Sequence, residues 1–206
     1  MSKIAIVAGG CGLIGKAIVE GLHGIVDDVF MVDISGNPDF KTSIFDTDFL
    51  TIIDMVKPCI FVDATYPVGI NGVYVPVINS VCSKMSGAVV LLSSIYGNVS
   101  HRPENYKDTT VKETPLEYGF IKAGIIQLTR MLAVKYAPKL RVNCVSPGGV
   151  FDNQDPVFVE RYCKNVPMGR MATPEDIAGP VCFLASDEAK YVTGINLKID
   201  GGLCAW

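Results

Sequence analysis

Short apolar runs alternate with longer stretches of helical spacing along most of the chain. The runs are rich in β-branched residues and are apolar at successive positions, as strands buried on both faces of a sheet are. They predict strands at residues 3–8, 29–32, 59–64, 88–93, 140–145 and 195–199, and a weaker strand at 42–45. Such strands, joined by helices, predict a parallel sheet with helices on both faces.

Helical spacing is clearest in three segments of the chain. One is residues 13–22, and another carries an apolar face from residue 50 to residue 56, where Thr47 or Asp48 could cap the helix. The longest runs over residues 116–136. Short connections and right-handed crossovers then favour an α/β fold with a doubly wound, Rossmann-type sheet.

Composition narrows the class of protein. A chain of 206 residues with 49% hydrophobic and 19% charged residues predicts one globular domain over residues 1–206. The net charge of −3 and the absence of a Lys/Arg run argue against a nucleic-acid partner. The first apolar run is too short to span a bilayer and has no leader-type cleavage site, so we expect no membrane partner and a cytoplasmic protein.

Seven cysteines are scattered along the chain, and none belongs to a C-x-x-C pair. An odd, irregularly spaced set suits neither a disulfide framework nor a zinc site, so we expect no metal. Reduced thiols that serve as small core residues are the simpler interpretation.

A glycine-rich turn follows the first predicted strand. Residues 9–15 read Gly-Gly-Cys-Gly-Leu-Ile-Gly and open the first helix. Glycines allow the backbone to approach a pyrophosphate, whose charge then lies at the helix N-terminus. Glycines end many strands, but this position between a strand and a helix favours dinucleotide binding.

Asp33 ends the second strand 18 residues after Gly15, close to the ~20 expected of a ribose-binding acid. A carboxylate there accepts hydrogen bonds from the adenosine ribose and repels a 2′-phosphate, which predicts NAD rather than NADP. The alternative is a turn aspartate that precedes Ile34-Ser35-Gly36. Taken alone that alternative would be preferred, but the glycine turn before it favours NAD.

Tyr118 is the one tyrosine with a lysine four residues later, Lys122. On a helix this spacing places both side chains on one face, where an ammonium lowers the pKa of a phenol. An alcohol–ketone couple requires such a general acid and base. Solvated Tyr/Lys pairs are common on helices, but Ser94 at the end of the preceding strand brings a hydroxyl to the same cleft.

These motifs, together with Arg141-Val142-Asn143-Cys144-Val145-Ser146-Pro147-Gly148-Gly149-Val150, resemble in order the compact, single-domain branch of the short-chain dehydrogenase/reductase superfamily. Further similar stretches are residues 167–170, 174–178, 183–187 and 192–202. The resemblance covers nearly the whole chain and rests on several independent motifs.

The resemblance implies the following roles. Tyr118 transfers the proton, Lys122 lowers its pKa and holds the nicotinamide ribose, and Ser94 orients the substrate oxygen. It implies that NAD is bound by Gly9, Cys11, Gly12, Leu13, Ile14, Gly15, Asp33, Ile34, Asp46, Ala64, Thr65, Tyr118, Lys122, Pro147, Gly148 and Val150. It also implies a small, polar substrate and a homodimer or homotetramer.

Four departures from the family pattern stand out. The chain is short between Asp33 and Ser94, and the family's Asn-Asn-Ala-Gly is here Asp63-Ala64-Thr65-Tyr66. The family's catalytic asparagine has no clear counterpart, and Asn71, the nearest, falls late. Residues 97–115 form an insertion over the active site, which is either a substrate lid or a subunit contact. His101 within it is expected to be a solvated loop residue.

Within the superfamily, residues 62–67, 94–97 and 147–154 resemble proteins labelled flagellin-modification protein A, which are associated with bacterial surface sugars of the nonulosonic-acid kind. The sequence therefore predicts an NAD(H)-dependent oxidoreductase that interconverts a secondary alcohol and a ketone, on a sugar or nucleotide sugar. The alternative is a catalytically weak NAD-binding scaffold or redox sensor. An epimerase would need a substrate domain for which this chain has no room.

Overall fold

The computed structural model describes residues 2–66 and 73–205, and in this part of the chain seven parallel strands form one sheet. The strand order is β3-β2-β1-β4-β5-β6-β7. The chain builds the sheet outward from β1 to β3 on one side, and then returns to place β4 on the other side of β1. The strands are β1 Ile4–Ala8, β2 Asp28–Asp33, β3 Phe40–Lys41, β4 Ile60–Asp63, β5 Gly87–Leu92, β6 Leu140–Pro147 and β7 Asn196–Ile199. The predicted Rossmann-type sheet is confirmed.

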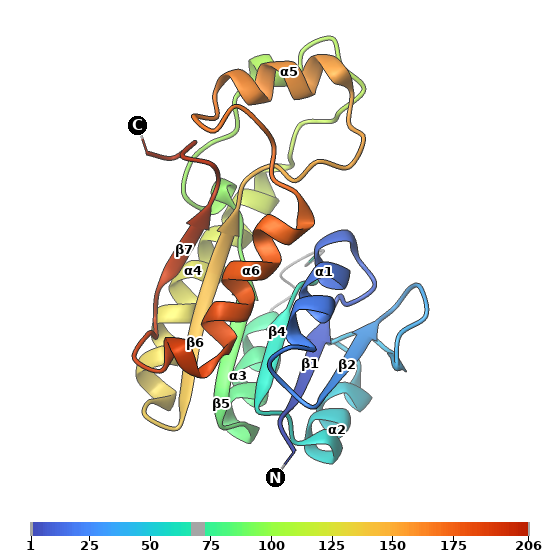
Figure 1. Cartoon of the computed structure of the whole chain (residues 1–206), viewed down its shortest axis with the longest axis vertical. Helices are drawn as coiled ribbons and strands as arrows, with labels where there is room; N and C mark the ends of the chain where they lie inside the picture. The colour runs from blue at the N-terminus through green and yellow to red at the C-terminus, as the bar shows by residue number, and fades with distance from the viewer. Residues whose placement is uncertain (1, 67–72, 206) are drawn as a thin grey trace.

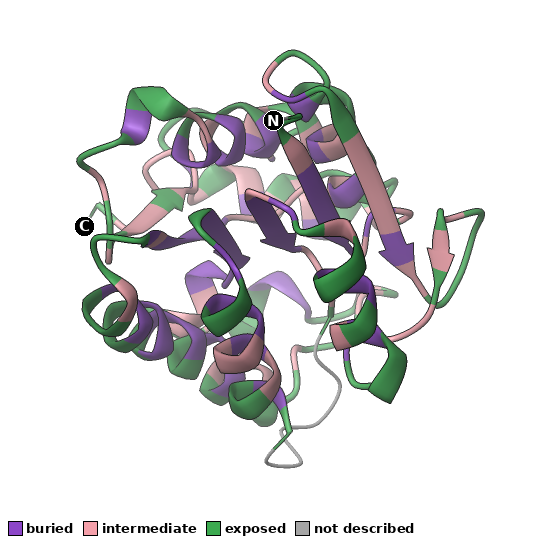
Figure 2. Ribbon diagram, turned by 90° about the horizontal axis from the view of Figure 1, so that it is seen from below, coloured by how far each residue is buried: buried purple, intermediate pink, exposed green. Residues whose placement is uncertain are grey.

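Helices cover both faces of the sheet (Figures 1 and 2). They are α1 Leu13–Leu22, α2 Thr47–Val56, α3 Tyr74–Lys84, α4 Leu116–Tyr136, α5 Pro156–Lys164 and α6 Pro174–Ala185. Helices α1 and α6 pack on one face, and α2, α3 and α4 pack on the other. Among the residues described, no helix has both the length and the apolar character needed to cross a bilayer.

The central strands are buried on both sides, as their unbroken apolar sequences predict. In β4, Phe61 faces α2–α4 and Val62 faces α1 and α6, and neither is exposed to solvent. The ring of Phe61 packs against Phe49 of α2 with 6.0 Å between centroids. Truncating such a buried phenylalanine to alanine typically costs about 3–5 kcal/mol.

Two predictions near residue 45 are wrong. The third strand is Phe40–Lys41 rather than 42–45. The residues that follow this strand form a turn, because they are hydrogen-bonded to the Asp46 carboxylate. It accepts hydrogen bonds from Thr42 Oγ1 at 3.0 Å and Ser43 N at 2.8 Å. Helix α2 has Asp46 at its N-cap position instead of Thr47 or Asp48, and no side chain caps it.

The segment between β5 and α4 packs with α5 above the carboxyl ends of the last strands (Figure 1). We call residues 97–115 and α5 the cap. Arg161 of α5 donates to the carbonyls of Glu104, at 3.0 Å, and Lys107, and the ring of Tyr106 packs against Phe158 at 5.2 Å. The cap therefore has its own small apolar core, which the polar composition of residues 97–115 did not predict.

Candidate active site

The glycine turn leaves no room for side chains where the phosphate-binding backbone is expected. Gly9 has a φ of +75°, and a Cβ there would lie 2.6 Å from the carbonyl oxygen of Ala64. A Cβ on Gly15 would lie 2.0 Å from the oxygen of Gly9. The first α1 hydrogen bond runs from Lys16 N to Gly12 O, so the N–H groups of Leu13, Ile14 and Gly15 have no helical acceptor and point toward the place of an anion. This cradle fits a dinucleotide pyrophosphate.

Asp33 lies at the carboxyl end of β2 and joins the glycine turn to that strand. Its carboxylate accepts hydrogen bonds from Cys11 N at 3.0 Å, Ser35 N at 3.1 Å and Ser35 Oγ at 3.2 Å. The turn role considered from the sequence is therefore present. It leaves part of the acceptor capacity free, since an ionised carboxylate has about four lone-pair sites.

The remaining predicted adenosine contacts lie at the same edge. Ile34 is 69% exposed beside Asp33, as an apolar platform for a base would be. Asp46 lies on the surface beyond β3, a strand whose Lys41 pairs in register with Asp33. Its carboxylate already accepts the two hydrogen bonds of the turn before α2. Its role in cofactor binding stays a prediction.

Ser94, Tyr118 and Lys122 come together where β5 ends against α4. Lys122 is 3% exposed, and its Nζ donates to the carbonyl oxygen of Leu92 at 2.8 Å and lies 5.5 Å from the centre of the Tyr118 ring. The Ser93 hydroxyl fixes the helix to the strand by donating to the Lys122 carbonyl oxygen at 2.7 Å. The helical spacing thus positions the pair as the sequence predicts.

The electrostatics of Tyr118 differ from the prediction. Burial raises the pKa of its phenol above the ordinary value, and the Ser94 hydroxyl lowers it. Burial also lowers the pKa of Lys122 to about 8, opposed by the carboxylate of Asp63. In this structure Lys122 binds the Leu92 carbonyl, and burial outweighs the groups that lower the Tyr118 pKa, so the predicted lowering by this lysine stays a prediction. The phenol is protonated at neutral pH, as an acid for ketone reduction must be.

Two cavities meet at these side chains. The first, of about 240 Å³, reaches from the glycine turn to the chemistry. Its walls include Ile14, Ala64, Thr65, Tyr118, Lys122, Pro147, Gly148 and Val150, all predicted cofactor contacts. The second, of about 540 Å³, lies under the cap. Both are lined by Ser94 and Tyr118, so a ligand in one would meet a ligand in the other at the Tyr118 phenol.

The second cavity has an aromatic wall that sequence reasoning missed. Tyr66 stacks on Tyr118 with 5.3 Å between ring centroids, and it stands where the family has glycine. The other aromatic side chains in the wall are Tyr96, Tyr106, Phe158 and Tyr162. They come from separate segments of the chain and meet because α5 packs against the stretch between β5 and α4, so no local pattern could have revealed the wall.

His101 is packed rather than solvated, contrary to expectation. Its side chain is 18% exposed, contacts the rings of Tyr96 and Tyr106 edge to face, and has Nε2 3.7 Å from the carboxylate of Glu113. It does not line the two cavities that meet at Tyr118. Asn71, the nearest counterpart of the missing asparagine, lies outside the described residues.

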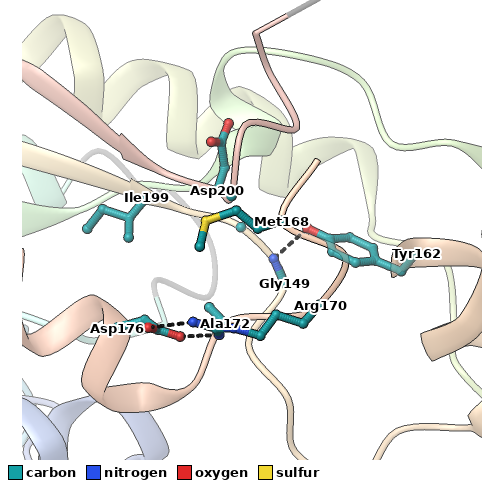
Figure 3. Close-up of a pocket in the computed structure, with 10 residues that line it drawn as sticks. Gly149, Tyr162, Met168, Arg170, Ala172, Asp176, Ile199 and Asp200 are labelled. Carbon is teal, nitrogen blue, oxygen red and sulfur yellow. Dashed lines mark hydrogen bonds and ion pairs between the residues drawn. The ribbon is translucent and has the colours of Figure 1, made fainter. Parts of the chain in front are cut away.

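The segment after β6 is held in place by contacts with α5 and with residues just before α6 (Figure 3). Gly149 N donates to the Tyr162 hydroxyl of α5 at 2.5 Å, and Val150 pairs with Ala172 in a parallel bridge. Just below, Arg170 and Asp176 form an ion pair with an Nη2–Oδ1 distance of 2.9 Å. The hydrogen bond from Gly149 to Tyr162 connects the cap to the backbone that would face the nicotinamide, around Gly148.

A dinucleotide-binding edge that opens onto a hydroxyl-lined substrate cavity is the arrangement of nicotinamide-dependent oxidoreductases, and it defines the class of this protein. Comparison with known proteins then gives the family. A family model described as enoyl-(acyl carrier protein) reductase matches residues 79–204. The chain belongs to the short-chain dehydrogenase/reductase family and is an NAD-dependent member of it.

Individual relatives support this assignment. The chain is 32% identical over 251 aligned positions to post-translational flagellin modification protein A of Campylobacter coli, with 98% of each chain covered. It is 37% identical to L-rhamnose 1-dehydrogenase (NAD(P)(+)) of Azotobacter vinelandii, over 57% of this chain and 44% of that enzyme. Among solved structures, a short chain dehydrogenase from Leptospira borgpetersenii with bound NAD+ aligns with a TM-score of 0.81. That match has 29% identity over 98% of this chain and 93% of the other.

Proposed function

We propose that this protein interconverts a secondary alcohol and a ketone, with Tyr118 as proton donor and acceptor. The observation that carries the proposal is the meeting of the two cavities at Ser94 and Tyr118. In the reductive direction the neutral phenol gives its proton to the substrate oxygen, and in the oxidative direction the phenolate removes it. The Ser94 hydroxyl holds that oxygen and stabilises charge developing on it.

We propose that NAD occupies the first cavity and the glycine turn. When bound, it supplies or accepts the hydride. Gly9, Gly12 and Gly15 would admit its pyrophosphate, and Asp33 would bind the adenosine ribose. The amino group of Lys122 would turn from the Leu92 carbonyl to the nicotinamide ribose, with which it shares the cavity.

For the substrate we propose a sugar or nucleotide sugar. The second cavity is large enough for a pyranose with a substituent, and its aromatic wall offers flat faces for sugar rings. Lys112, Glu113 and Gln154 add polar groups at the same cavity. Similarity to flagellin modification protein A supports a place in the synthesis of bacterial surface glycans, of the nonulosonic-acid kind.

The cap would close this site over its substrate. Its residues 111–115 line the second cavity, and Arg161 of α5 holds the segment 97–115 to that helix. Between the two roles considered for residues 97–115, these contacts support the substrate lid. Residues 1–206 would then work as one unit in which the cap and the sheet share the active site.

We also propose self-association, as a homodimer or homotetramer, through the outer face of α4. Its exposed apolar side chains are spaced by four, eleven and three residues, close to whole turns of a helix, which places them in one stripe. They are Leu116, Phe120, Met131 and Val134, with exposed fractions of 63–85%. A cytoplasmic location stays a prediction from the sequence.

The proposal is tested by screening the purified protein with NAD or NADH against alcohols, ketones and nucleotide sugars, following absorbance of the reduced nicotinamide. Tyr118→Phe should keep its NAD affinity and lose turnover by about 10²–10⁴-fold, the usual contribution of a general acid. Tyr136→Phe, on the same helix but away from both cavities, is the matched control. Tight NAD binding with no turnover on any substrate would favour the scaffold alternative.

A further inference from the structure

Two buried residues with formally charged side chains lie in one layer of the protein. Within residues 2–66 and 73–205, Asp63 is 2% exposed and Lys122 is 3% exposed, and the other buried polar side chains are neutral. Removing a charge from water is costly unless an opposite charge or hydrogen bonds compensate for it. A pair of opposite sign in the same layer therefore calls for an explanation.

The sheet geometry brings the two side chains together. Side chains alternate along a strand, so Asp63 at the end of β4 faces the same side as Phe61, toward α3 and α4. Asp63 pairs in register with Leu91 of β5, and the next residue, Leu92, supplies the carbonyl that Lys122 Nζ binds at 2.8 Å. The carboxylate and the ammonium thus lie over neighbouring strand ends under the same helix layer.

The carboxylate of Asp63 is surrounded by hydrogen-bond donors. It accepts hydrogen bonds from the Tyr74 hydroxyl at 2.6 Å, from Thr65 Oγ1 at 2.6 Å and from Thr65 N at 3.0 Å. All three groups donate, and such hydrogen bonds offset the cost of burying a carboxylate.

The other titratable groups around Lys122 are neutral. Tyr118 on α4, Tyr74 on α3 and Tyr96 after β5 are phenols whose pKa values are raised by burial, and the Cys144 thiol of β6 has its pKa raised to about 11. Burial lowers the pKa of Lys122 to about 8, and Asp63 is the group that opposes this shift.

We propose that Asp63 is a positioning residue for Lys122: through space, its buried carboxylate keeps the lysine ammonium charged and available to Tyr118 and the cofactor ribose. The inference rests on the proposed function, which gives Lys122 its task. Neither partner needs a direct ion pair, because Lys122 is bound to the Leu92 carbonyl and Asp63 to Tyr74 and Thr65.

The test follows the ionisation of Lys122 directly, by NMR of the protein labelled with ¹³Cε-lysine and assigned with Lys122→Met. In Asp63→Asn, which keeps the shape but removes the charge, the titration midpoint of Lys122 should fall by about one pH unit, as expected for loss of a nearby opposite charge. The pH at which NAD affinity declines on the alkaline side should fall by the same amount. Tyr74→Phe, which removes a hydrogen bond to Asp63 and leaves its charge, is the matched control and should change neither.

An unchanged Lys122 midpoint in Asp63→Asn would overturn the inference, whatever the variant's activity. A midpoint that falls equally in Tyr74→Phe would also overturn it, since the effect would then come from packing. If Asp63→Asn does not fold, the same titration is measured on the double variant Asp63→Asn with Tyr74→Phe, which lacks the hydroxyl that would face the new amide. Its Lys122 midpoint is then compared with that of Tyr74→Phe alone. The two proposals can fail separately. If the Lys122 midpoint falls in Asp63→Asn but Tyr118→Phe keeps its turnover, the charge pairing is supported and the proposed function is refuted.

Discussion

Replacing Gly15 with alanine tests whether the glycine turn is shaped for close approach. Gly15 is buried in the first turn of α1, and the added Cβ would lie 2.0 Å from Gly9 O. Ordinary contact needs about 3.5 Å, so the turn and the helix would have to separate by roughly 1.5 Å. Backbone atoms on both sides make this movement costly.

The expected magnitudes follow from that clash. Alanine normally stabilises a helix by about 0.5–1 kcal/mol relative to glycine, whereas overpacking of a tight site costs about 1–3 kcal/mol. We therefore expect Gly15→Ala to lower the free energy of unfolding by about 1–2 kcal/mol. Displacing the phosphate-binding N–H groups removes charge-assisted hydrogen bonds of about 1.5–3 kcal/mol, so NAD affinity should fall about 10–100-fold.

The measurements are urea denaturation and a fluorescence titration with NADH. Gly124→Ala is the matched control, because Gly124 also lies in a helix but a Cβ there meets nothing within 4 Å. That variant should be as stable as the unmodified protein or more so, and it should bind NADH equally well. Unchanged NADH affinity in Gly15→Ala would refute the assignment of the pyrophosphate to this turn.

Three further outcomes are expected. Asp33→Ala should weaken NAD binding and reduce the difference in affinity between NAD and NADP. If the unmodified protein binds NADP more tightly than NAD, the assignment of Asp33 to the ribose is contradicted. Ser94→Ala removes the group that lowers the Tyr118 pKa, so the phenolate forms at higher pH and the rising limb of alcohol oxidation should move to higher pH. Met131→Glu with Val134→Glu should reduce the molar mass measured by light scattering without altering NAD affinity, and an unchanged mass would exclude this face as the contact.

The elements that the sequence predicted well are those whose pattern is local. The apolar strands and the helix at 116–136 needed only periodicity, and the Tyr118–Lys122 pair needed only helical spacing. The strand expected at 42–45 was wrong because the Asp46 side chain competes for the backbone there. Such a contact depends on the turn geometry and leaves little trace in hydropathy.

The substrate side of the site could not be predicted in the same way. The cap core joins Tyr106 to Phe158, residues separated by a helix and a strand, and these contacts turned a polar-looking insertion into a packed layer. The pKa of Tyr118 likewise depends on its burial and on the Ser94 hydroxyl beside it. Neither can be read from the spacing of Tyr118 and Lys122.

The shortened stretch between Asp33 and Ser94 is compatible with an intact site because the strand ends, rather than the helices, position the chemistry. The four residues of β4 span about 13 Å, and the eleven residues of α3 span about 16 Å, so a short helix still returns the chain across the whole sheet. Asp63 and Ser94 remain at the carboxyl edge whatever the length of the helix between them. A shorter connection therefore changes the rim of the site, where Tyr66 stacks on Tyr118. It does not change the order of the strands, which positions Lys122 and the glycine turn.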